Sequence, residues 1–207
     1  MKKFLVFSLL IASSLAARAH DEGLSSANSS NPGAYTGKQA SKVSSEVPEE
    51  LVGVGIKEKI GDSIDLNLIV TDESGSQKPL STYFSKHKPV ILSPVYFNCP
   101  GLCNFHLNGL VDALKTVDWS PSDKFEVIAL SFDPKENSKD NANVPAKKKA
   151  SYMKVYDRAG TENGFHFVTA DEVTIKKITD SVGFQYKWNE KEQQWSHASA
   201  AIIISPE

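Results

Sequence analysis

The chain has 207 residues, of which 40% are hydrophobic and 23% are charged, and this length and composition suit one globular domain with additional segments. The 23 Lys and Arg residues nearly balance the 25 Asp and Glu residues, so the formal net charge at pH 7 is -2. Such a balance gives no support for nucleic acid as a partner.

The first 19 residues have the pattern of a secretory signal peptide. Lys2 and Lys3 precede an apolar run over residues 4–17, and the sequence Ala-Arg-Ala at residues 17–19 fits a small-x-small cleavage site. The run is short for a membrane span, although an uncleaved anchor is the alternative. No cysteine lies near the cleavage site to carry a lipid. We therefore expect an exported protein of the periplasm or cell envelope, with no integral membrane segment after cleavage.

Residues 20–50 are rich in Ser, Asn, Gly and Glu and show neither helical nor strand periodicity. They cannot bury enough apolar surface to offset ordering, so a flexible leader is expected here. Cleavage after Ala19 would make His20 the N-terminus, where its imidazole and the α-amine form an additional candidate chelate for copper. The folded domain is expected over residues 51–207.

The first half of this domain contains two predicted strands. Alternating apolar residues predict a strand over residues 64–70, followed by a turn over residues 72–75. A helical turn is expected over residues 80–86. Residues 90–97 are apolar on both faces, as in a central strand, but Pro94 predicts a bulge or an early strand end because proline has no N–H to donate.

The only two cysteines of the chain, Cys99 and Cys103, follow this strand where a helix is expected to begin. Pro100 suits the first helical position, and apolar residues continue at helical spacing through Leu107, Leu110, Leu114 and Val117. The spacing of four residues places both thiols on one side of the first turn, within reach of a disulfide or of one soft metal ion. The helix N-terminus should lower the pKa of both thiols.

A structural disulfide is the plain alternative for this pair. Because a bridge across so short a loop removes little entropy from the unfolded chain, it would contribute little stability. We therefore expect a functional dithiol, either redox-active or metal-binding.

A second buried strand is predicted over residues 125–132. Together with the strand over residues 90–97 and the cysteine helix, it forms a βαβ unit, which indicates an α/β fold with parallel strands. A helix is expected over residues 145–158, with Ala146, Ala150 and Met153 facing inward and residues 147–149, all lysine, in solvent.

The last predicted elements lead to a histidine. A helix over residues 171–182 is expected to end at Gly183. Residues 184–188 and 193–197 predict a hairpin, in which Trp188 and Trp195 are expected to pack. The hairpin would deliver His197 to the start of a final strand over residues 200–204.

Three parts of this sequence resemble the SCO/SenC family of copper proteins. They are the apolar strand leading into Cys-Pro-Gly-Leu-Cys at residues 99–103, the sequence Ser-Phe-Asp-Pro at residues 131–134, and His197 leading into Ala-Ile-Ile-Ile-Ser-Pro at residues 201–206. The resemblance covers roughly residues 53–207 and implies a thioredoxin-like α/β fold, with a central mixed sheet flanked by helices.

The sequence departs from the family pattern in three respects. Asn104 stands where many members have proline, and the usual N-terminal anchor looks cleavable here. The family's closing strand and C-terminal helix would lie beyond Glu207, so the chain is expected to be truncated at its C-terminus.

The resemblance implies that Cys99, Cys103 and His197 bind copper, as Cu(I) or Cu(II). It also implies a chaperone, rather than an enzyme, that helps to metallate the binuclear copper site of cytochrome c oxidase or acts on the thiols of that site. The expected partner is the oxidase subunit that carries this site, or another copper chaperone. Two thiolates and one imidazole suit Cu(I), a soft ion that accepts few ligands.

Other functions use the same residues. In a thiol–disulfide reductase, Cys99 would attack a target disulfide and Cys103 would resolve the mixed disulfide. His106, three residues after Cys103, would complete a Cys₂His₂ zinc site, although a helix-face position beside the site is the expected role. Asp133 is a candidate for electrostatic tuning of the site. A purely structural envelope domain is the remaining alternative.

Overall fold

The structure is a computed structural model that describes residues 47–84 and 87–206. The predicted signal peptide, His20 and almost all of the predicted leader therefore lie outside the described residues. Within the described part, no helix combines the length and apolar character that crossing a bilayer requires.

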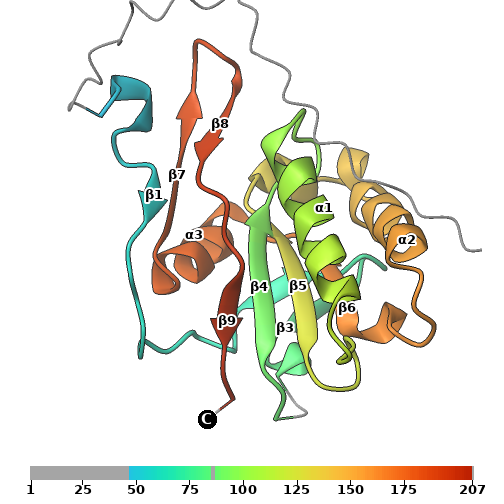
Figure 1. The fold of residues 1–207 in the computed structure, drawn as a ribbon. Helices are drawn as coiled ribbons and strands as arrows, with labels where there is room; N and C mark the ends of the chain where they lie inside the picture. Colours follow the sequence, from blue (N-terminus) through green and yellow to red (C-terminus); the bar gives the residue numbers. More distant parts are fainter. Residues whose placement is uncertain (1–46, 85–86, 207) are drawn as a thin grey trace, which may run out of the picture. The chain divides into compact units, whose positions relative to one another are not determined.

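A mixed four-stranded sheet forms the centre of the fold (Figure 1), in the order β6-β5-β4-β9. The strands β4, β5 and β6 are parallel, and β9 runs antiparallel to β4. Their bounds are Val90–Val95 for β4, Glu126–Ser131 for β5, Phe165–Val168 for β6 and Ile202–Ile204 for β9. Nearly every residue of β4 and β5 is buried, so both faces of the sheet are covered, as predicted for central strands.

Three helices flank this sheet (Figure 1), and they are α1 over Leu102–Lys115, α2 over Val144–Tyr156 and α3 over Glu172–Ser181. The helix α1 connects the parallel strands β4 and β5, which confirms the predicted βαβ unit. Its buried side is formed by Cys103, Leu107, Val111 and Leu114. The helix α2 packs beside α1, and α3 packs against β7.

Two smaller sheets complete the fold. The strands β1 (Gly55–Ile56), β7 (Phe184–Asn189) and β8 (Gln194–His197) form one sheet, in which β7 and β8 are the predicted hairpin. The strands β2 (Ile69–Thr71) and β3 (Gln77–Pro79) form the other. Short 3₁₀ helices occupy Glu49–Leu51, Leu80–Tyr83, Pro134–Asn137, Lys139–Asn141 and Glu162–Gly164.

Several predicted boundaries differ from the structure. The strand predicted over residues 64–70 is limited to β2, because only this stretch pairs with β3. The helix α1 begins at Leu102 after Gly101, so Pro100 does not occupy its first position. The strand β4 ends at Val95, two residues before the predicted end, and Pro94 lies inside the strand, paired with Leu130 of β5. Pairing with β9 reaches only Leu92, so the missing N–H of Pro94 lies beyond that ladder.

The buried side of α2 also differs from the prediction. Pro145, Tyr152 and Tyr156 are buried, whereas Ala146 and Ala150 are exposed and Met153 is only partly buried. The two tyrosines, spaced by one helical turn, offer far more area to bury than the alanines do. This rotation brings two of the lysines expected in solvent against the protein. Lys148 donates to Asn104 Oδ1 at 2.8 Å, and Lys149 pairs with Glu73.

The helix α3 and the following turn agree with the sequence. The Asp171 side chain caps the helix by accepting the Thr174 N–H at 3.0 Å. Gly183 follows the helix with a φ of +70°, a conformation that only glycine adopts readily. This turn leads directly into β7 and so fixes where the hairpin begins.

Candidate metal centre

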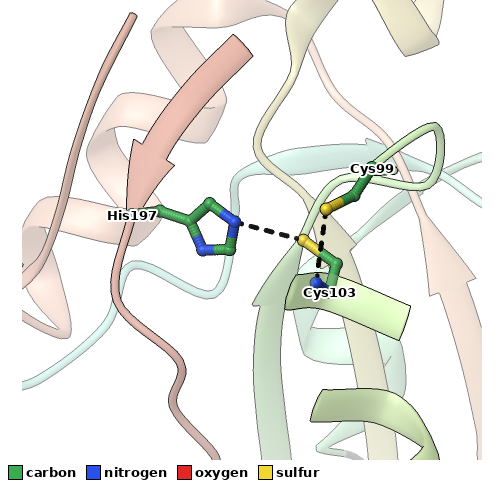
Figure 2. Close-up of side chains that lie close together, drawn as sticks. All are labelled: Cys99, Cys103 and His197. Atoms are coloured by element: carbon green, nitrogen blue, oxygen red, sulfur yellow. Dashed lines mark hydrogen bonds between the residues drawn. The ribbon is translucent and has the colours of Figure 1, made fainter. Parts of the chain in front are cut away.

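Three predicted site residues come together between the end of β4, the start of α1 and the end of β8 (Figure 2). Cys99 lies in the loop before α1, Cys103 lies in the first turn of α1, and His197 is the last residue of β8. One potential ligand atom from each lies within 4.8 Å of the other two. Both cysteines are buried and free, and His197 is half-buried. In the part of the chain that the structure describes, this is the single such group of three histidine, cysteine or acidic side chains.

The two thiols have different surroundings. The backbone N–H of Cys103 donates to Cys99 Sγ at 3.3 Å, and the backbone N–H of Tyr96 donates to Cys103 Sγ at 3.3 Å. Burial acts to raise the pKa of Cys99, but hydrogen bonds from the Cys103 and Gly101 N–H groups and from the Tyr96 side chain outweigh it, so this pKa is lowered.

The pKa of Cys103 moves in the opposite direction. Burial raises it strongly, and the adjacent negative charge of Cys99 raises it further. The expectation that the helix N-terminus lowers the pKa of both thiols is therefore wrong for Cys103, because its sulfur points into the core. Of the two thiols, Cys99 therefore loses its proton more readily than Cys103 does.

The imidazole of His197 is held in the tautomer that a metal ligand needs. Its Nδ1–H donates to the carbonyl oxygen of Ala198 at 2.7 Å, which leaves the Nε2 lone pair directed at Cys103 Sγ, 3.4 Å away. Burial lowers the pKa of His197, so the ring is neutral at pH 7. The rings of Phe132 and Tyr96 contact it, with centroids 5.1 and 5.7 Å from that of the imidazole.

The other candidate ligands lie outside this group. His106 Nε2 is 2.6 Å from Ser93 Oγ, so this ring faces the strand β4 and not the sulfurs. Asp133 accepts the Lys135 N–H at 3.0 Å and caps the following 3₁₀ helix. His166 lies 3.2 Å from Glu126, and His87 is exposed.

Two further residues, which were not predicted from the sequence, form hydrogen bonds with the cysteine loop. Glu136 is a buried carboxylate that accepts backbone N–H groups from the loop. Asn104 Nδ2 donates to the Cys99 carbonyl oxygen at 2.9 Å while its Oδ1 accepts from Lys148. Neither pattern is visible in the sequence, because each bond joins residues of different elements.

No family model matches the chain, and no curated protein matches it. Several solved structures are similar to the chain. A protein of Aquifex aeolicus VF5 is 24% identical, with a TM-score of 0.54, and the match covers 71% of this chain and 79% of that one.

Two Sco structures are also similar. Arabidopsis thaliana ScoI with copper bound is 18% identical, with a TM-score of 0.52 and coverage of 70% of this chain and 83% of that one. BsSco, a member of the Sco family of cytochrome c oxidase assembly proteins, is 19% identical, with a TM-score of 0.50 and coverage of 73% and 82%. The chain therefore has the thioredoxin-like fold of the SCO/SenC proteins.

Proposed function

We propose that the protein is a copper-binding chaperone of the SCO/SenC type, in which Cys99 Sγ, Cys103 Sγ and His197 Nε2 hold the ion. The observation that carries this proposal is the gathering of these three atoms within 4.8 Å. Two sulfurs and one imidazole form a soft donor set that suits Cu(I). A structural zinc site would need a fourth ligand, and His106, the candidate that the sequence offers, forms a hydrogen bond with Ser93 instead.

The protonation states of the three residues indicate how copper would enter. Cys99 is the readiest ligand because its pKa is lowered, and His197 is already neutral. Cys103 must lose its proton to bind, so copper uptake would release protons. With only three protein ligands, a thiol of a partner can add to the ion and replace them one at a time, which allows transfer by ligand exchange.

We further propose that the protein acts in the periplasm or cell envelope and passes copper to the binuclear copper site of cytochrome c oxidase. The basic and apolar pattern of residues 1–19 supports export. The shared fold with BsSco, which belongs to a family of oxidase assembly proteins, supports the choice of partner. Another copper chaperone is the partner expected on the donor side.

A thiol–disulfide reductase is the second candidate, favoured by the unequal thiol pKa values. The Cys99 thiolate would attack a target disulfide and release one target thiolate. Cys103, after losing its proton, would attack the Cys99 sulfur and release the second. The target would then hold two thiols, and Cys99 and Cys103 would be joined by a disulfide.

The deciding experiment is a Cu(I) titration of the reduced protein in competition with a coloured chelator, with Cys99→Ser and His197→Ala measured in parallel. Binding of one equivalent that is lost in both variants supports the chaperone. Absence of copper uptake, together with reduction of a disulfide substrate that survives His197→Ala, supports the reductase. Retention of zinc by the parent and its loss on His106→Ala would overturn the copper assignment.

A further inference from the structure

The loop that leads to Cys99 leaves the central sheet before it reaches the cysteine. The ladder between β4 and β5 ends at Val95, whose carbonyl accepts the Phe132 N–H at 2.8 Å. The backbone N–H groups of residues 96–99 therefore need hydrogen-bond partners outside the sheet. Tyr96 donates to Cys103 Sγ, and Cys99 donates to the Tyr96 carbonyl oxygen at 3.3 Å. The two N–H groups between them, those of Phe97 and Asn98, both donate to Glu136.

The Glu136 side chain is buried and held by several hydrogen bonds. It belongs to the 3₁₀ helix Pro134–Asn137, and only 1% of its surface is exposed. Its Oε2 accepts the Phe97 N–H at 2.7 Å and the Ser131 hydroxyl at 2.5 Å, and its Oε1 accepts the Asn98 N–H at 2.7 Å. Burial raises the pKa of this carboxyl, whereas the hydrogen bonds from Ser131, Phe97 and Asn98 act to lower it and favour the ionised form.

We propose that Glu136 is a positioning residue for the dithiol. Its carboxylate fixes the backbone at Phe97 and Asn98, immediately before Cys99, and so sets the distance between the two sulfurs and His197. Glu136 makes no hydrogen bond to the three candidate ligands, so it acts on them through the loop and through its charge, which raises the pKa of Cys103. The inference deepens the proposed function, because it concerns the same site.

The chemistry of the contact makes the carboxylate hard to replace. Glutamine has one oxygen, and its NH₂ group would face either the Phe97 N–H or the Asn98 N–H, so that one donor would meet another donor. Aspartate is one methylene shorter and cannot reach both groups from the same backbone position. In either variant the N–H of Phe97 or that of Asn98 loses its hydrogen bond to residue 136.

The first test needs no metal. The reduced protein is equilibrated with mixtures of glutathione and glutathione disulfide. Cys99 and Cys103 form an intramolecular disulfide as one glutathione disulfide is reduced to two glutathione molecules. The equilibrium constant gives the effective concentration of one thiol at the other, which depends on how well the loop holds Cys99. Glu136→Gln is expected to lower this value by about tenfold, equivalent to about 30 mV in the reduction potential.

The matched control is Glu126→Gln, the same change at another buried glutamate. Glu126 is 2% exposed and lies at the first residue of β5, whereas Ser131, beside Glu136, is the last. It contacts His166 and is far along the strand from the cysteine loop. We expect Glu126→Gln to lower the free energy of unfolding without changing the effective concentration of the thiols.

The second test measures Cu(I) affinity of the same variants. The expected dissociation constant of Glu136→Gln is about 10- to 100-fold higher than that of the parent, the range typical of residues that orient metal ligands. A Glu136→Gln protein that folds and keeps both the effective concentration and the affinity of the parent would overturn the proposal. If the parent binds no copper, the proposed function fails, and the glutathione measurement alone still decides the role of Glu136.

A milder variant covers the case in which Glu136→Gln does not fold. Ser131→Ala removes the hydroxyl that orients the carboxylate but leaves both N–H bonds possible. It is expected to shift the thiol equilibrium in the same direction by a smaller factor. No shift in a folded Ser131→Ala protein, with Glu136→Gln unfolded, would contradict the positioning role.

Discussion

The Nε2 atom of His197 lies 3.4 Å from the Sγ atom of Cys103, although 94 positions separate the two residues in the sequence. Cys103 is placed by α1, whereas His197 is placed by the hairpin of β7 and β8, in which it pairs with Tyr186. The site therefore depends on how the hairpin packs against the loop and the helix. Metal binding should respond to changes in the hairpin that touch neither sulfur.

Trp195 offers a direct test of this dependence. Its ring contacts those of Trp188, Tyr186 and Phe132, at centroid distances of 5.2, 5.3 and 6.2 Å, and Phe132 also contacts His197. Trp195→Ala should lower the free energy of unfolding by about 2–3 kcal/mol, below the range for a fully buried tryptophan because this one is half-buried.

The same variant should also weaken copper binding, because His197 loses part of its support. Trp119→Ala is the matched control, since that ring is 65% exposed and lies outside the hairpin. Unfolding followed by fluorescence and a Cu(I) titration measure both effects. Equal copper affinity of the parent and Trp195→Ala would show that the hairpin does not position His197.

The two cysteines should differ in reactivity. The pKa of Cys99 is lowered and that of Cys103 is raised, and thiolates are the reactive form. Exposure favours the same residue, since Cys99 is 6% exposed and Cys103 is 1% exposed. Brief treatment of the reduced protein with iodoacetamide, followed by mass spectrometry of peptides, should find Cys99 alkylated first. Preferential alkylation of Cys103 would contradict the described thiol environments.

Stability of the metal-free protein should fall in mild acid. Burial lowers the pKa of His197 and also that of His106. Below the usual histidine pKa of about 6.5 the unfolded chain binds protons that the folded protein does not, so the free energy of unfolding decreases as the pH falls from there toward the lowered values. Urea unfolding at a series of pH values measures this slope.

Histidine variants identify the source of the slope. His197→Gln and His106→Gln should each reduce it, whereas His87→Gln, at an exposed position, should leave it unchanged. An unchanged slope in both buried variants would mean that other groups cause the pH dependence.

Replacement of glycine by alanine should change the free energy of unfolding in opposite directions at Gly183 and at Gly109. A Cβ at Gly183 would lie 1.8 Å from the Lys57 carbonyl oxygen, and φ there is +70°. Gly183→Ala should therefore cost about 2–4 kcal/mol of folding free energy, through backbone strain and overlap at the start of the hairpin.

Gly109 lies inside α1 with open space around its Cβ position, and Gly109→Ala should stabilise the protein by about 0.5–1 kcal/mol. Urea unfolding compares them, and a destabilised Gly109→Ala protein would contradict this description of α1.

Hydrophobic pattern was sufficient to predict the central elements. Both faces of β4 and β5 are buried, so their sequences are apolar throughout, and the spacing from Cys103 to Leu114 marks the inner side of α1. The buried side of α2 was missed because the sizes of Tyr152 and Tyr156 outweighed the helical spacing of the smaller residues. The two thiol pKa values differ because burial dominates at Cys103, whereas hydrogen bonds from two backbone N–H groups and from the Tyr96 side chain outweigh burial at Cys99.

The candidate site was predictable from the sequence only in part, because some of its contacts join residues that are far apart in the chain. Cys99 and Cys103 are neighbours in the sequence, and the position of His197 was expected from the family resemblance. Glu136 could not be found, since its contacts with Phe97 and Asn98 cross 39 and 38 positions of the chain. Its local sequence reads as an ordinary polar turn after a strand.

The most direct test of the proposed copper site is X-ray absorption at the copper edge of the Cu(I)-loaded protein. We expect two sulfurs and one imidazole nitrogen bound to copper, with the imidazole signal lost in His197→Ala and one sulfur lost in Cys99→Ser. A set of copper ligands without sulfur, or one that is identical in the parent and His197→Ala, would contradict the proposed site.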